Sequence, residues 1–149
     1  MRNAIDLSVD VGGLRIRNPT MLASGILGIS YEVFKRVYEA GIGAIVSKSI
    51  SIDPREGYKN PTVLSVECGY LNAVGLSNPG MDAFSKEIAN NSDIPIVVNL
   101  VGSTENEFVS MVKKFDHLKK ELSISDSLVL ENIHTNELCN WLEYVKNDI

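Results

Sequence analysis

Three short apolar runs alternate along this chain with three stretches of helical periodicity. The apolar runs are 20–23, 44–47 and 94–100, and the helical stretches are 31–40, 81–89 and 105–115. Strands that are almost wholly apolar are typical of parallel sheets, because both of their faces are buried. Repeated alternation of strand and helix predicts a parallel sheet with the helices packed outside it. The sequence therefore predicts an α/β fold.

The two ends of the chain differ from this central pattern. Near the N-terminus, Ile5, Leu7 and Val9 alternate with polar residues, and a second apolar segment, 14–16, follows the turn Gly12-Gly13. This pattern predicts an N-terminal β-hairpin. Beyond residue 115 the pattern weakens, although 121–130 is compatible with a fourth strand and 136–146 with an amphipathic helix. We therefore expect a single domain over 1–149 with a divergent tail at 116–149.

Composition excludes several classes of protein. The 149 residues carry a net charge of -5 with acids and bases interspersed, which argues against a nucleic-acid-binding surface. No apolar run approaches the ~20 residues of a membrane span, and the first six residues lack the apolar core of a signal peptide. Cys68 and Cys139 are isolated and show no metal-ligand spacing. These features predict a cytoplasmic protein without a metal site or membrane anchor.

A long connection, residues 48–80, follows the second apolar strand. A connection of this length inside a compact domain is usually functional or disordered. It contains many apolar side chains, and disorder would leave them in water. The apolar residues are Val63, Leu64, Val66, Tyr70, Leu71, Val74 and Leu76. We interpret the connection as an ordered substrate-binding loop carried by a rigid strand.

Each predicted strand of the parallel sheet ends in polar or small residues. Ser24 ends the first, Lys48 and Ser49 end the second, and Asn99 lies near the end of the third. Ligands bind at the carboxyl ends of parallel strands, so three such ends predict one shared site. Lys48 could also be a solvated lysine, and Ser24 and Asn99 could simply satisfy backbone groups at the strand ends.

Two side chains suggest the kind of ligand. The charge of Lys48, if enclosed in a pocket of low dielectric constant, would attract an anion or an electron-rich ring. The amide of Asn72 can donate and accept hydrogen bonds, which suits an imide or carboxylate edge, although Asn72 could instead be a turn residue. Cys68 has no histidine near it in the sequence, so we expect an inert thiol.

A set of motifs, in this order and spacing, resembles the dihydroorotate dehydrogenase family. The motifs are Asn18-Pro19, Ala23-Ser24-Gly25, Lys48-Ser49, Pro54-Arg55-Glu56-Gly57, Leu71-Asn72-Ala73-Val74-Gly75-Leu76, Asn78-Pro79-Gly80 and Val98-Asn99-Leu100-Val101-Gly102-Ser103. The resemblance covers roughly residues 7–115 and looks closest to class 1 enzymes that work with a partner subunit. A related flavin barrel such as dihydropyrimidine dehydrogenase would share the lysine and asparagine regions, but the run 72–76 favours orotate as ligand.

The resemblance implies a partial (β/α)8 TIM barrel, about the first half, closed at its base by the N-terminal hairpin. It implies a flavin oxidoreductase of pyrimidine biosynthesis that oxidises dihydroorotate to orotate and transfers the hydride to FMN. It also implies an iron-sulfur and FAD electron-transfer subunit as partner. Carried over by position, the FMN contacts are Ser24, Lys48, Ser49 and Asn99, and the orotate contacts are Lys48, Asn72, Ala73, Val74, Gly75 and Leu76.

The chain departs from the family after residue 115. The family has a strand ending in Leu-Asn-Ile-Ser-Cys-Pro-Asn, whose cysteine is the catalytic base. The nearest segment here is 121–127, with Ser123 in place of the asparagine and Asp126 in place of the cysteine. The expected cysteine base is therefore absent, no residue is assigned as the base, and Asp126 stays a candidate.

The length predicts an incomplete barrel, because such barrels need about 250 residues. An open half barrel exposes its sheet edges and its apolar inner face, so we expect the chain to form a homo-oligomer or to associate with a complementary half. The alternative to an enzyme portion is a non-catalytic truncated fragment that acts only through association.

Overall fold

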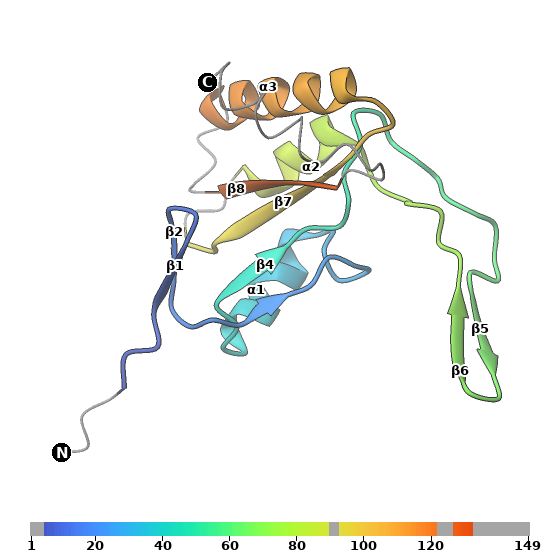
Figure 1. Cartoon of the computed structure of the whole chain (residues 1–149), viewed down its shortest axis with the longest axis horizontal. Coiled ribbons are helices and arrows are strands. Elements are labelled where there is room, and N and C mark those ends of the chain that lie inside the picture. Colours follow the sequence, from blue (N-terminus) through green and yellow to red (C-terminus); the bar gives the residue numbers. More distant parts are fainter. Residues whose placement is uncertain (1–4, 90–92, 122–126, 133–149) are drawn as a thin grey trace.

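The computed structural model describes residues 5–89, 93–121 and 127–132. Its centre is a four-stranded sheet in the order β3-β4-β7-β8, and all three pairings are parallel (Figure 1). The strands are β3 (Met21–Leu22), β4 (Ala44–Val46), β7 (Ile96–Val101) and β8 (Ser127–Asn132). Neighbouring strands follow the order of the chain, as in a (β/α)8 barrel, whereas a doubly wound sheet reverses direction at its centre.

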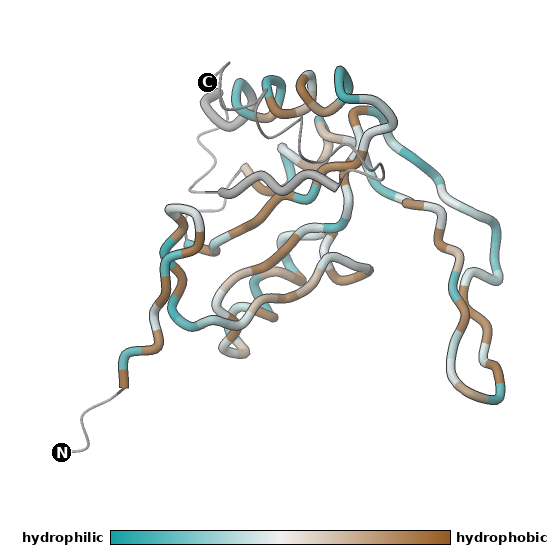
Figure 2. Tube along the Cα trace, in the orientation of Figure 1, coloured by the Kyte–Doolittle hydropathy of each residue, from teal (hydrophilic) through white to brown (hydrophobic). Residues whose placement is uncertain are grey.

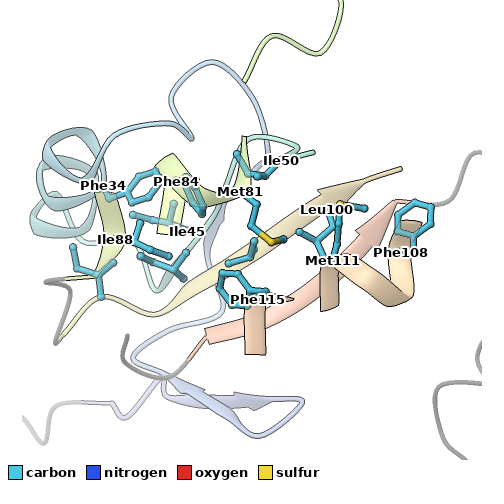
Figure 3. Close-up of a cluster of buried hydrophobic side chains, with 13 residues drawn as sticks. Phe34, Ile45, Ile50, Met81, Phe84, Ile88, Leu100, Phe108, Met111 and Phe115 are labelled. Carbon is cyan, nitrogen blue, oxygen red and sulfur yellow. The ribbon is translucent and has the colours of Figure 1, made fainter. Parts of the chain in front are cut away.

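Three helices pack on one face of this sheet: α1 (Tyr31–Glu39), α2 (Met81–Ile88) and α3 (Glu105–Glu121). Alternate residues of β7 enter the same apolar cluster as these helices, as expected from the period of two in a strand. Figure 3 shows this cluster, in which the Phe34 and Phe84 rings lie edge to face with centroids 6.4 Å apart. The buried members are Phe34, Ile45, Ile50, Met81, Phe84, Ile88, Ile94, Ile96, Val98, Leu100, Phe108, Met111 and Phe115.

The predicted N-terminal hairpin covers the opposite face. Strands β1 (Val9–Val11) and β2 (Leu14–Ile16) pair antiparallel around two glycines, with φ of 60° at Gly12 and 86° at Gly13. Leu14 and Ile16 pack against residues of β4 and β7 in a second apolar cluster. The hairpin is shorter than predicted, because the ladder ends at the Val9–Ile16 pair and leaves the preceding apolar residues in solvent.

The parallel elements agree with prediction in order but differ in extent. All six residues of β7 are buried, as expected for a central strand. In contrast, β3 has only two residues and lies at an edge of the sheet. Met21 in β3 is 37% exposed, so the prediction that this strand is buried on both faces was wrong. Helix α3 continues to Glu121, past the expected end at residue 115, and β8 confirms a fourth strand. The predicted helix at 136–146 lies outside the described residues.

The long connection is ordered, but its apolar side chains are not buried as expected. It contains an antiparallel hairpin, β5 (Val63–Val66) and β6 (Gly69–Asn72), which projects from the sheet (Figure 1). Figure 2 shows hydrophobic residues along this hairpin, and Leu64 and Leu71 are 53% and 62% exposed. The apolar content therefore forms an exposed surface instead of a core. Within the described ranges, no helix is long and apolar enough to cross a membrane.

Candidate functional site

The strand-end cluster, defined here as Ser24, Ser47, Lys48, Ser49 and Asn99, lies at the carboxyl ends of three parallel strands. The Asn99 Nδ2 group contacts the Ser24 Oγ atom at 2.9 Å and the Ser49 Oγ atom at 3.1 Å. Ser24 and Ser49 follow β3 and β4, and Asn99 lies in the second half of β7, which pairs with β4. The structure thus joins three of the four residues that the family resemblance suggests as FMN contacts.

Ser47 belongs to this cluster although sequence analysis did not select it. Its side chain is fully buried, accepts a hydrogen bond from the Asn99 backbone N–H at 3.0 Å and donates to the Lys48 carbonyl at 2.9 Å. A serine at the end of an otherwise apolar strand was the available signal, but it was read as part of the strand. Ser47 connects the backbones of two predicted ligand-binding positions.

The backbone of Lys48 is held from its other side by Gly28. The Lys48 N–H donates to the Gly28 carbonyl at 2.8 Å. A Cβ atom on Gly28 would lie 2.3 Å from the Lys48 nitrogen, closer than any side chain allows. Only glycine therefore permits the 25–30 segment to approach this strand end.

The side chain of Lys48 is an enclosed cation. Lys48 is 9% exposed, and among the described residues no carboxylate forms an ion pair with it. Enclosing a charge without a partner is costly, and an anionic or electron-rich ligand would offset that cost. Lys48 is therefore not a freely solvated lysine, and its role in ligand binding stays a prediction.

The donor and acceptor groups of the cluster suit a polar ring. The Asn99 amide nitrogen is occupied by two serines, and within the described part of the chain its Oδ1 atom accepts no hydrogen bond. Lys48 supplies donors and Asn99 an acceptor, which fits the alternating acceptors and N–H donor on the pyrimidine edge of a flavin.

The predicted orotate segment, residues 72–76, lies where β6 returns toward the body of the protein. It pairs with the part of the connection that precedes β5, called here the outgoing arm. The Ala73 N–H donates to the Thr62 carbonyl at 2.8 Å, and the Tyr58 N–H donates to the Val74 carbonyl at 3.1 Å. Asn72 is exposed at the end of β6. These contacts place the segment on a two-stranded ribbon, and the prediction that Asn72 and Lys48 open into a common mouth stays a prediction.

Two backbone features shape the end of this segment. Gly75 has a φ of 74°, and Leu76 has a φ of 54° although it is not glycine. A Cβ atom on Gly75 would lie 2.8 Å from the Tyr58 ring, so the two arms of the ribbon touch here. The lack of a side chain at Gly75 is therefore used for the close approach of Tyr58 from the other arm.

Other candidate groups lie apart from the strand-end cluster. A cavity of about 320 Å³ lies between the 51–55 segment and α3, and its lining includes Arg55, Val101 and Met111 but no cluster member. Cys68 is exposed at the hairpin turn. In the described residues no group of three His, Cys, Asp or Glu side chains could hold a metal ion. The candidate base Asp126 lies outside those residues.

Comparison with known proteins supports one family. The sequence profile of dihydroorotate dehydrogenase matches residues 6–128. Three relatives are named dihydroorotate dehydrogenase B (NAD(+)), catalytic subunit. The Pyrococcus furiosus protein is 39% identical over 115 residues, which are 76% of this chain and 38% of the relative. The Methanocaldococcus jannaschii protein is 39% identical over 127 residues, 80% of this chain and 42% of the relative. The Thermoanaerobacter pseudethanolicus protein is 43% identical over 115 residues, 75% of this chain and 38% of the relative.

A solved structure extends the likeness to the fold. The crystal structure of Eimeria tenella DHODH in complex with ferulenol superposes with a TM-score of 0.63 at 19% identity, covering 78% of this chain and 35% of that one. The chain thus spans about two fifths of the length of the relatives it matches. With the profile matching most of its residues, the chain belongs to the dihydroorotate dehydrogenase family.

Proposed function

We propose that this chain carries FMN- and orotate-binding residues of a dihydroorotate dehydrogenase that acts in pyrimidine biosynthesis. Four residues would hold FMN: Ser24, Lys48, Ser49 and Asn99. The segment from Asn72 to Leu76 would hold orotate through its amide and backbone groups, together with Lys48. The observation that carries the proposal is the Asn99 amide, which joins residues from three strand ends in one hydrogen-bonded cluster.

Lys48 would have the central electrostatic role. Its enclosed charge would stabilise negative charge on the ligand, and the effect is larger in a pocket of low dielectric constant than in water. FMN, when bound, would supply the hydride acceptor. Ser47 and Gly28 would fix the Lys48 backbone, so that the lysine meets the ligand without a large loss of conformational entropy.

The complete reaction would need more than these residues. No described residue is assigned as the base, and the chain spans 38–42% of the three relatives compared above. We therefore expect ligand binding to be separable from turnover. Those relatives are named catalytic subunits, which supports an iron-sulfur and FAD electron-transfer subunit as the partner of the complete enzyme.

Ligand binding and turnover test the proposal separately. Orotate and FMN binding to the purified chain would be measured by calorimetry and by flavin fluorescence, and dihydroorotate oxidation with an artificial electron acceptor. We expect weak orotate binding that Lys48→Ala lowers below the detectable range, by about 100-fold, and no turnover by the chain alone. Orotate affinity unchanged by Lys48→Ala, or no orotate binding at all, would overturn the assigned site. Robust turnover would show that the described residues do not need the rest of a barrel.

A second candidate function is association without catalysis. The sheet has open edges at β3 and β8 within the described residues, and the β5–β6 hairpin exposes apolar side chains. Unpaired strands and exposed apolar patches favour contact with another chain. Under this alternative, Lys48→Ala would leave oligomerisation unchanged and there would be no orotate binding to lose.

A further inference from the structure

The buried amide of Asn78 lies at the base of the ribbon that carries residues 72–76. Asn78 is 5% exposed, and its backbone N–H and carbonyl both pair with Arg55 across the two arms, each at 2.9 Å. Residues 78–80 come directly before α2, and Gly80 is the residue that caps it. The backbone geometry agrees with a turn, but the side chain does more than start the helix.

The side chain of Asn78 makes two different sets of hydrogen bonds. Its Oδ1 atom accepts from the backbone N–H of Gly80 at 2.9 Å and from that of Ser51 at 3.2 Å. Its Nδ2 group donates to the Ser51 Oγ atom at 3.0 Å and to the Leu76 carbonyl at 2.8 Å. The oxygen thus holds the entry to α2 and the outgoing arm, whereas the nitrogen reaches the last residue of the orotate segment.

Leu76 is a residue whose conformation needs such support. Its φ of 54° lies in the left-handed region, which residues other than glycine rarely adopt. Leu76 is also partly exposed, so packing alone does not impose this conformation. A residue in a disfavoured backbone region persists only when its surroundings fix it, and such residues concentrate at ligand-binding sites.

We propose that Asn78 is a positioning residue for the orotate segment. Its Nδ2 group holds the Leu76 carbonyl, which keeps Leu76 left-handed and presents the backbone of residues 74–76 to the ligand. Asn78 does not itself touch the ligand. This inference rests on the proposed function for its ligand, but its structural part, the control of the Leu76 conformation, is independent of ligand binding.

Two variants separate positioning from general support. Asn78→Asp keeps oxygen acceptors for Gly80 and Ser51 but removes the donor to Leu76, and it places a second oxygen against the Leu76 carbonyl. Ser51→Ala removes the hydroxyl that also donates to the Asp53 carbonyl at 2.7 Å, yet leaves the Asn78–Leu76 hydrogen bond intact. Asn78→Asp therefore perturbs the orotate segment at Leu76, whereas Ser51→Ala perturbs only the base of the ribbon.

Hydrogen exchange of the full chain, measured by mass spectrometry, would follow the opening of the amides that donate across the ribbon, those of Tyr58, Ala73 and Asn78. We expect Asn78→Asp to speed this exchange about tenfold, the factor for losing one hydrogen bond to a buried group. Ser51→Ala should lower the thermal midpoint but leave this exchange unchanged. Equal exchange in both variants, or exchange that follows only the thermal midpoint, would overturn the proposal.

Orotate binding is the second measurement. We expect Asn78→Asp to weaken it about tenfold and Ser51→Ala to leave it near the wild-type value. Equal binding by the wild type and Asn78→Asp would overturn the proposal. If the wild type binds no orotate, the proposed function fails for this chain, while the exchange data still decide whether Asn78 fixes the segment.

A third measurement needs no variant. Both Nδ2 hydrogens of Asn78 are donated inside the protein, so the side-chain amide signals of Asn78 in the nuclear magnetic resonance spectrum of the wild type should exchange slowly with solvent. Fast exchange of these signals would overturn the proposal, even if Asn78→Asp failed to fold.

Discussion

At the scale of single residues, Lys48 carries most of the proposed chemistry while contributing little to the fold. It is enclosed without an ion-pair partner among the described residues, so its charge costs stability unless a ligand compensates. Residues at binding sites often lower the stability of the folded protein in this way, because they are retained for function. Removing the Lys48 charge should therefore lower the affinity for the ligand without lowering the free energy of unfolding.

Replacing Lys48 by Ala is expected to weaken orotate binding by about 100-fold, equivalent to the ~2–3 kcal/mol of a hydrogen bond to a charged group. The free energy of unfolding should stay equal or rise, because an enclosed charge is removed. Calorimetric titration and urea unfolding would measure the two effects. Lys59→Ala is the matched control, since Lys59 is exposed on the ribbon and should change neither value. Equal affinity losses in both variants would contradict a specific role for Lys48.

Gly28 is a second residue whose role follows from geometry. A Cβ atom there would lie 2.3 Å from the Lys48 nitrogen and 2.8 Å from the Ser47 carbonyl carbon, and both of these are backbone atoms that cannot rotate away. Gly28→Ala should lower the free energy of unfolding by about 3 kcal/mol, as expected for overpacking. Gly25→Ala is the control, because the nearest atom lies 4.0 Å away, and it should change stability by less than about 0.5 kcal/mol. Denaturant unfolding of both variants would check this difference.

Sequence alone could predict which side chains gather at the strand ends but not what holds them. The grouping of Ser24, Ser49 and Asn99 follows from the rule that parallel strands end at one edge of a sheet. Ser47 and Gly28 escaped prediction because their roles depend on contacts between segments distant in the chain. No local pattern specifies such contacts.

At the scale of elements, the helices and β7 were predicted because their apolar periodicity is strong. The β5–β6 hairpin was missed although a signal existed: Val63–Val66 and Gly69–Asn72 are two strand-like runs with two residues between them. The argument from apolar content assumed burial, whereas these residues pair by hydrogen bonds and stay exposed. Pairing and burial are separate properties that composition does not distinguish.

The contact between α1 and α2 gives a prediction at this scale. Phe84 is 1% exposed and meets Phe34 edge to face, so Phe84→Ala should cost about 3–5 kcal/mol of unfolding free energy. The control on the same helix is Asp82→Ala, which removes an exposed ion pair with Lys114 at 3.2 Å and should cost less than about 1 kcal/mol. Circular dichroism during denaturant unfolding would compare them. Similar costs would show that the apolar cluster does not dominate helix packing.

At the scale of the whole molecule, both faces of the sheet are used for packing, and the candidate site lies at the ends of the strands. The helices fill one face with large apolar side chains, and the N-terminal hairpin covers part of the other. The strand-end cluster lies at the carboxyl ends of β3, β4 and β7, beyond the hairpin cluster formed with β4 and β7. Barrel enzymes show the same division, with active sites at the C-terminal ends of the strands and stabilising residues at the N-terminal ends.

The open sheet and the projecting hairpin give different predictions for self-association. An edge contact would be weakened by a lysine at position 21 in β3, because charged side chains on edge strands oppose strand pairing. A hairpin contact would be weakened by the double substitution Leu64→Lys and Leu71→Lys, whose side chains lie opposite each other on one face. Both sites are exposed, so neither change should lower folding stability by more than about 1 kcal/mol.

Sedimentation at several protein concentrations would distinguish the two surfaces. We expect the wild-type chain to associate and the hairpin variant to shift toward monomer more than Met21→Lys does, since the hairpin exposes larger apolar area along two strands, whereas β3 offers only two residues. A larger shift with Met21→Lys would assign association to the sheet edge instead. A wild-type chain that stays monomeric and unfolds cooperatively at every concentration would show that neither surface binds a second copy. The hairpin would then be stabilised within one chain, by the pairing of β5 with β6 and by the ribbon contacts at Tyr58, Thr62 and Arg55.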